Sequence, residues 1–203
     1  MISTQLDRLV DLGLADLAGI SASALASHAD ALTDEPGAVL AIHPALASAR
    51  QLAPLLSRAR KPGFVVGDLT DLEGFDALPG LEIPDSPLYV VTDLTRGDDL
   101  RNWSPNEALP AITGEGRTPL TINEGISWLL QEPGLLEPNH CFMTIGSRKP
   151  TPKGLDARTP ALWISGGTGH DGKETAGAPK VGWCWAGNRH TWLGFASART
   201  RRA

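Results

Sequence analysis

The sequence predicts an α+β protein in which a helical N-terminal third packs against a mixed, largely antiparallel sheet that ends in a C-terminal β-hairpin. Apolar residues recur at helical spacing near the start of the chain, whereas runs of β-branched and aromatic residues dominate its last part. Helices and strands are mixed first, and strands then follow one another, which is an order typical of α+β proteins. We expect a single domain over residues 1–203, with a helical segment at 1–35, a β-rich core at 88–196 and a short tail at 199–203.

The first third of the chain shows helical periodicity. Apolar side chains recur at helical spacing and are interrupted by Gly13; they are Leu6, Leu9, Val10, Leu14 and Leu17. A second helix starts near Ser21 or Ser23, either of which could cap it. The breakers at 34–37 then end this helical region.

A strand and a third helix follow. Residues 38–42 are apolar and bounded by breakers, which predicts a buried strand. Pro44 is well placed to open a helix that continues to residue 59, because a proline at the first helical position loses no hydrogen bond. Residues 64–66 predict a short strand, and residues 67–87 an irregular surface stretch rich in glycine, proline and aspartate.

The centre of the chain contains the helix with the strongest sequence signal. Residues 88–92 predict a strand, and 102–110 predict a loop with at most one helical turn. Thr121 and Glu124 then fit a capping box, in which each side chain bonds the backbone N–H of the other. The apolar residues behind this box share one helical face, and they are Ile122, Ile126, Leu129 and Leu130.

The most informative segment is a tryptophan-rich stretch near the C-terminus. Strands are predicted at 141–145, 161–164, 181–186 and 191–196. Gly187-Asn188 suits a two-residue turn between the last two strands, since both residues tolerate a positive φ. Because successive side chains alternate between the faces of a strand, one face of this hairpin carries Trp183, Trp185, His190 and Trp192.

This aromatic face has two interpretations. It is a layer of the core, since cross-strand aromatic pairs stabilise sheets, or it is a binding face for a small molecule or peptide. Three indole N–H groups and one imidazole need hydrogen-bond partners when buried, which makes a purely apolar core less favourable. In the binding interpretation Arg148 and Asn106 are additional polar contacts, and Ser147 and Ser165 are weaker candidates because they follow predicted strands.

Cys184 and His190 suggest an alternative site. A thiolate–imidazole pair would make the protein a hydrolase or transferase with a cysteine nucleophile. A two-residue turn directs these two side chains to opposite faces, whereas a three-residue loop would bring them together with Trp192. The spacing therefore favours a buried, apolar role for Cys184 and leaves the catalytic alternative open.

Composition limits the other classes. The net charge of −5 argues against a nucleic-acid partner, and the basic cluster of Arg199, Arg201 and Arg202 is interpreted as a solvated tail. Neither a secretory signal nor a membrane span is found, so we expect a cytoplasmic protein without a membrane partner. The five histidines and two cysteines lack zinc-site spacing, and no nucleotide-binding fingerprint occurs. We therefore expect no metal and no cofactor.

Several motifs together resemble a known family. They are Pro105-Asn106, the stretch from Gly116 to Ile122, Gly146-Ser147-Arg148, the stretch from Pro160 to Ser165, and the stretch from Gly182 to Asn188. In these motifs the chain resembles an uncharacterised, mainly actinobacterial family of about 200 residues, filed as a domain of unknown function. The resemblance implies a small intracellular bacterial protein; it implies no activity and no catalytic residues.

These observations predict a non-catalytic protein that binds a small molecule or peptide through its Trp/His-lined face. Whether the chain is an enzyme stays open, with the Cys184/His190 hydrolase or transferase as the alternative. A third hypothesis is an interaction module in which the N-terminal helices dock a partner protein.

Overall fold

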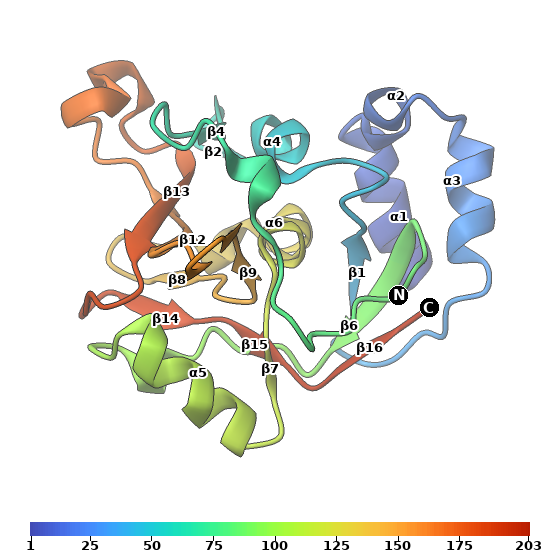
Figure 1. The fold of residues 1–203 in the computed structure, drawn as a ribbon. Helices are drawn as coiled ribbons and strands as arrows, with labels where there is room; N and C mark the ends of the chain where they lie inside the picture. Colours follow the sequence, from blue (N-terminus) through green and yellow to red (C-terminus); the bar gives the residue numbers. More distant parts are fainter.

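A computed structural model describes residues 1–203, apart from the side chain of His170. The α+β class is confirmed, and Figure 1 shows helix α6 (Ile122–Gln131) between two sheets. The Ser127 hydroxyl of α6 accepts the Ile42 backbone N–H of one sheet at 3.0 Å, while Trp128 packs on Phe142 of the other. Every residue from Ile122 to Leu130 is buried, because the helix has a sheet on each side.

The smaller sheet has three strands in the order β1 (Val39–Ile42), β6 (Leu88–Thr92) and β16 (Thr200–Arg202), all antiparallel. The larger sheet has five strands in the order β14 (Leu193–Phe195), β8 (Cys141–Met143), β12 (Arg158–Ile164), β13 (Pro179–Trp185) and β4 (Phe64–Val65). Its central pairs are antiparallel, and both edge strands run parallel to their neighbours.

The predicted N-terminal helices are present as α1 (Ile2–Asp11), α2 (Leu14–Ala18) and α3 (Ala22–Ala29). Gly13 separates the first two with a left-handed φ of 89°, and the Ser21 hydroxyl caps α3 by accepting the Ala24 N–H at 3.1 Å. The remaining short elements are β2 (Ser57–Arg58), β3 (Lys61–Pro62), η2 (Leu72–Gly74), β5 (Asp76–Ala77), η3 (Asp98–Leu100), β7 (Thr118–Pro119), η4 (Pro133–Leu135), β9 (Ser147–Arg148), β10 (Pro150–Thr151), β11 (Gly154–Leu155), η5 (Gly169–Asp171), η6 (Lys173–Thr175) and β15 (Ser197–Ala198).

Two helix predictions are wrong. The helix expected from Pro44 to residue 59 is only α4 (Ala49–Leu52) followed by η1 (Ala53–Leu55), because Ser48 and Gln51 form a capping box and Pro54 cannot donate a helical bond. The loop expected at 102–110 is instead the start of α5 (Pro105–Gly114). Its capping box joins Ser104 to Glu107, with a proline at the first helical position.

The predicted C-terminal hairpin is also wrong. Each residue of β13 pairs with β12, and β14 pairs in parallel with β8, so β13 and β14 are not neighbours. A turn does follow β13, but it is centred one residue earlier than predicted, on Ala186-Gly187, and it is closed by the Asn188 N–H on the Trp185 carbonyl at 3.0 Å. The chain then leaves the sheet, and the His190 carbonyl accepts the Asn102 N–H at 2.9 Å.

The C-terminal residues are not a solvated tail. Thr200–Arg202 form the edge strand β16, and the Arg201 guanidinium donates to both Glu124 oxygens at 2.5 and 2.9 Å. The exposed fractions of these side chains are 5% for Arg201 and 0% for Glu124. Glu124 also completes the predicted capping box with Thr121, so one carboxylate begins α6 and anchors the last strand.

Candidate functional site

The structure divides the predicted aromatic residues between two places. Trp183 and Trp185 lie on the same face of β13, with ring centroids 4.6 Å apart, and Trp185 is 48% exposed. Trp192 follows the turn and packs edge-on against Trp163 at 6.1 Å, with the His190 ring 5.5 Å away. Trp163 pairs with Lys180 across the two strands, so these two side chains share a face of the sheet. Because Lys180 is an odd number of residues from Trp183 on β13, Trp163 lies on the face opposite to Trp183.

Trp163 and Trp192 border an open cleft of about 390 Å³, here called the aromatic cleft, which Asn139, Cys141 and Ser165 also line. Within the described part of the chain, the indole N–H groups of both tryptophans donate no hydrogen bond, whereas the Trp183 indole donates to Asp68 at 3.2 Å. The aromatic cleft is therefore bordered by two tryptophans whose indole N–H groups are unused.

The other predicted contacts lie elsewhere. Arg148 is buried in β9, where its guanidinium donates to the Asp156 carbonyl at 2.8 Å, and its Nε has no partner among the described atoms. Burial lowers the pKa of Arg148, and the Asp156 charge only partly opposes this. Asn106 is exposed on α5, and its backbone N–H binds the Ala186 carbonyl at 3.1 Å. Neither side chain is hydrogen-bonded to a tryptophan in the described structure.

Cys184 and His190 do not form a catalytic pair in the described structure, since no hydrogen bond joins their side chains. Burial raises the pKa of the Cys184 thiol to about 11, with Lys180 opposing the shift only slightly. Burial also lowers the pKa of His190, whose Nε2 has no partner among the described groups. A protonated thiol beside an unconnected imidazole lacks the activation that a cysteine nucleophile requires.

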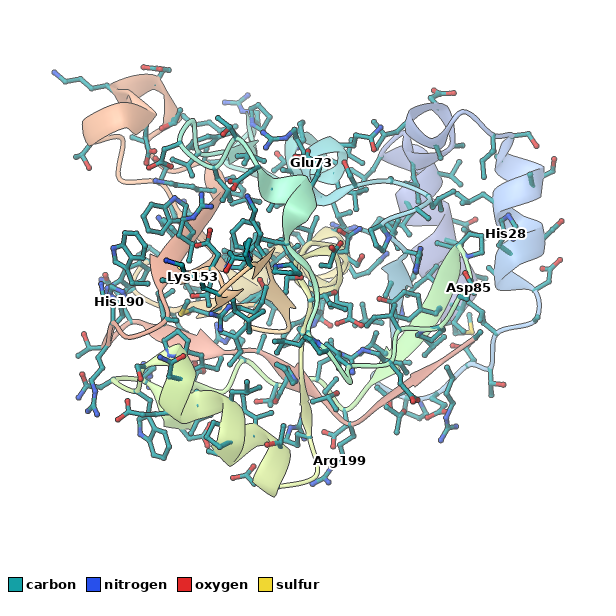
Figure 2. All side chains as sticks on the ribbon, in the orientation of Figure 1. His28, Glu73, Asp85, Lys153, His190 and Arg199 are labelled. Atoms are coloured by element: carbon teal, nitrogen blue, oxygen red, sulfur yellow. The ribbon has the colours of Figure 1, made fainter. Side chains whose placement is uncertain are left out.

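A more enclosed site lies at the N-terminal end of α6. This α6 cleft has a volume of about 380 Å³. Its walls are mainly apolar and include Leu72, Phe75, Ile83 and Ile122. In Figure 2 Glu73, at the mouth of this cleft, lies beside the α4 and η2 ribbons, whereas His190 lies at the far left edge of the molecule. The α6 cleft and the predicted aromatic residues are therefore separate candidate sites.

Ser147 forms part of the cleft floor. It is 2% exposed, and its Oγ accepts the Ile122 backbone N–H at 3.0 Å, which satisfies one of the first amides of α6. The hydroxyl hydrogen of Ser147 has no acceptor among the described residues. Ser147 can therefore still donate one hydrogen bond into the cleft.

Asn123 contributes both a donor and an acceptor. Its Nδ2 donates to the Ile42 carbonyl at 3.1 Å and to the Ala47 carbonyl at 2.9 Å, which fixes the orientation of the amide. The residue is 4% exposed, yet its Oδ1 accepts no bond from the described chain and is not sealed from solvent. The backbone N–H of Asn123 is likewise unpaired within the described hydrogen bonds. Both groups are available to a molecule in the cleft.

His43 lies at the end of β1, on the third side of the cleft. Its Nδ1 accepts the Ala45 N–H at 3.1 Å, so in the neutral ring the proton is on Nε2. That nitrogen has no partner in the described structure. The ring lies edge-on to Tyr89, whose hydroxyl donates to Glu124 at 3.0 Å. Burial first, and the Glu124 charge second, raise the pKa of Tyr89, so this wall is an uncharged phenol.

The mouth of the cleft carries charge, but its cation is already paired. Arg50 bonds Glu73 at 2.6 Å and the Leu69 carbonyl at 2.7 Å, and Asp76 is exposed beside them. The Arg50 bond comes first among the causes that lower the pKa of the Glu73 carboxyl, so Glu73 is ionised. The mouth therefore has one more negative charge than positive.

The fold and this cleft define an α+β protein with an enclosed, mainly apolar cleft of small-molecule size at a helix N-terminus. The model of a family of unknown function (DUF5701) matches residues 8–203, so the chain belongs to that family. Comparisons with curated proteins and with solved structures each find no match.

Among the described residues, no helix combines the length and apolar character needed to cross a bilayer. The described side chains contain no group of three histidine, cysteine, aspartate or glutamate residues that could hold a metal ion.

Proposed function

We propose that this protein binds a small molecule in the α6 cleft without transforming it, and that it acts in the cytoplasm. The observation that carries the proposal is the pair of buried side chains, Asn123 and Ser147, that keep unused hydrogen-bonding groups on the floor of an apolar cleft. A ligand that pairs with these groups replaces the water that can reach them, and each such hydrogen bond contributes about 0.5–1.5 kcal/mol net. Typical ligand sites are mainly apolar with a few convergent polar groups, and their volumes begin at about 300 Å³.

The chemistry of the cleft supports binding over catalysis. Ser147 is the hydroxyl in the cleft that we consider as a nucleophile, and its oxygen already accepts a hydrogen bond from the Ile122 N–H. A serine nucleophile needs a base that accepts its proton, and the described residues place no such acceptor on Ser147. The hydroxyl thus serves as a hydrogen-bond donor.

A fragment screen followed by heteronuclear NMR tests the proposal. Fragments that bind should shift the backbone amide signals of His43, Asn123 and Ser147 in a saturable way. Ala77 is the cross-strand partner of Ser147 and lines the cleft, so Ala77→Trp should fill the cleft and abolish these shifts. Trp185→Ala, on an exposed side chain outside the cleft, is the matched control and should leave them unchanged. A screen in which no fragment shifts these three amides would refute the proposal.

The aromatic cleft is a second candidate for ligand binding. The unused indole donors of Trp163 and Trp192 favour it, because partly exposed aromatic rings with free N–H groups suit a planar ring or a sugar. In this proposal His190 and Trp192 keep the binding role predicted from the sequence. Trp183 and Trp185 form a separate surface. Arg148 and Asn106 belong to neither the aromatic cleft nor that surface. Trp192→Phe should then change the ligand-induced fluorescence response, and Trp185→Phe should not; equal responses would contradict this second site.

A further inference from the structure

We propose that the α6 cleft selects an uncharged molecule with an apolar ring body and a cyclic amide at its polar end. This inference rests on the proposed function, and it adds the chemical class of the ligand. A cyclic amide presents a carbonyl acceptor directly beside an N–H donor on one edge. The floor of the cleft presents the complementary set of groups.

The residues that carry the donors all line the same cleft. Ser147 Oγ accepts the Ile122 N–H, and the next amide along the helix is the unpaired N–H of Asn123. The Asn123 side chain is bonded to the carbonyl of Ile42, the residue before His43. Ser147, Asn123 and His43 thus line one cleft, and we infer that a ligand carbonyl accepts from the Ser147 hydroxyl, the Asn123 N–H and the His43 Nε2.

The hydrogen-bond acceptor in the cleft, Asn123 Oδ1, determines which class of ligand fits. The Asn123 amide is fixed because two carbonyl oxygens hold its Nδ2, and Asn123 lines the cleft with an Oδ1 that accepts no bond from the described chain. A carboxylate has acceptors only, so it would place an anionic oxygen near this unpaired carbonyl oxygen. An amide N–H instead donates to it. The α6 dipole favours an anion modestly, but Glu73 and Asp76 at the mouth oppose one.

The groups on the floor also disfavour a cation, although Glu73 and Asp76 at the mouth would attract one. An ammonium has donors only and would leave the Asn123 N–H, the Ser147 hydroxyl and the His43 Nε2 without acceptors. A neutral hydrocarbon would leave all of these groups unpaired. Only a ligand with both a donor and an acceptor satisfies the floor.

The walls suit a flat, apolar body. Leu72, Phe75 and Ile83 come from one segment, and Ile122 faces them from α6. Phe75 is held from outside by the Arg158 guanidinium, 5.4 Å from its ring centroid. The wall is thus braced before a ligand arrives, which lowers the entropic cost of binding.

The test is a titration of the full chain with four small molecules of similar shape, followed by the amide signals of His43, Asn123 and Ser147. Oxindole carries the cyclic amide, N-methyloxindole lacks its donor, indane carboxylate is the acid, and aminoindane is the cation. We expect oxindole to bind about tenfold or more tightly than each of the others, since each leaves at least one buried group unpaired. His43→Phe keeps the ring against Tyr89 but removes a donor, so it should weaken oxindole binding several-fold, while Trp185→Ala should not.

The outcomes distinguish a failure of the proposed ligand class from a failure of the proposed binding function. If the carboxylate, the amine or N-methyloxindole binds as tightly as oxindole, the ligand class is overturned and the cleft remains a binding site. If none of the four shifts the three amides, the ligand class is again overturned. The fragment screen then decides the function independently, because it also contains molecules of other classes.

Discussion

Replacing Arg201 by methionine should destabilise the protein strongly, although this residue lies two positions from the end of the chain. Its guanidinium binds both oxygens of Glu124 and also donates to the Pro119 carbonyl at 2.9 Å and to the Thr118 hydroxyl. Burial by itself would lower the pKa of Arg201, but the Glu124 carboxylate outweighs burial and raises it. Both members of the pair are therefore charged and buried.

The size of the stability loss follows from the unpaired carboxylate that Arg201→Met leaves in the core. Methionine fills most of the apolar stem volume, but the Glu124 carboxylate, with a side chain 0% exposed, loses its cation. Removing one partner of a buried ion pair costs about 3–5 kcal/mol. With a urea dependence of about 2 kcal/mol per M, the unfolding midpoint should fall by about 2 M.

Urea unfolding followed by circular dichroism measures this loss. Arg202→Met is the control on the same strand, because the Arg202 side chain is 60% exposed and its bond to Glu35 is a surface ion pair worth about 0–1 kcal/mol. Arg201→Met combined with Glu124→Gln should be more stable than Arg201→Met alone, since no ion is then buried without a partner. If Arg201→Met lowers the midpoint no more than Arg202→Met does, the proposed anchoring of β16 is wrong.

Three further predictions concern acid stability, packing and thiol reactivity. Hydrogen bonds from Arg158 and then Lys149 hold the pKa of the Asp71 carboxyl below its usual range, so the stability it provides is complete above about pH 4 and is lost as pH falls through the lowered pKa. Asp71→Asn should therefore reduce the urea midpoint at neutral pH and flatten its acid dependence; an unchanged acid dependence would contradict this. Gly125→Ala should cost about 1–3 kcal/mol despite the better helix propensity, because its Cβ would lie 2.5 Å from a Thr144 methyl group. Gly114→Ala, with no neighbour within 4 Å, should not be destabilising, and equal effects would refute the packing argument. The Cys184 thiol, whose pKa burial raises to about 11, should react with iodoacetamide more slowly than free cysteine in the native state and at the normal rate in urea. If Cys184 in the native protein is alkylated faster than free cysteine, the hypothesis of a cysteine-dependent enzyme is supported instead.

The elements predicted correctly are those that local sequence determines. The start of α6 is one example, because Thr121 and Glu124 are three residues apart and bond each other without help from the rest of the chain. The pairing of β13 is the opposite case. A turn forms at Ala186-Gly187, one residue before the predicted position, but β13 joins β12 and β4 instead of the strand that follows it. A turn signal reports on four residues, whereas strand pairing depends on partners far away in the sequence.

Arg201 illustrates the same limit. In the sequence it belongs to a basic cluster at the end of the chain, and such clusters are usually solvated. Its partner Glu124 is 77 residues away. The residues next to Arg201 in the sequence do not indicate that Glu124 is its partner. Only the three-dimensional structure therefore distinguishes the buried Arg201 from its exposed neighbour Arg202.

The candidate site was only partly accessible from sequence. Strand alternation correctly places Trp183 and Trp185 on one face, but the position of Trp192 depended on the hairpin that does not form. Ser147 follows a predicted strand, which is a usable signal. Asn123 lies between the two members of a capping box, and His43 is the first residue after β1. These three residues come from three distant segments, so their convergence is a property of the tertiary fold alone.

The first turn of α6 connects the two main findings. Glu124 and Asn123 are consecutive, so their side chains leave the helix in different directions: Glu124 toward Arg201 of the last strand, and Asn123 toward the cleft and β1. The ion pair therefore holds the same turn whose free N–H and neighbouring side chains form the cleft floor. A floor fixed by buried bonds on its far side requires little rearrangement when a ligand binds, which is the condition under which a few hydrogen bonds give specificity. If the cleft binds a ligand as proposed, the buried Arg201–Glu124 pair has a role beyond stability, since it keeps the donor and acceptor groups of Asn123 in place for that ligand.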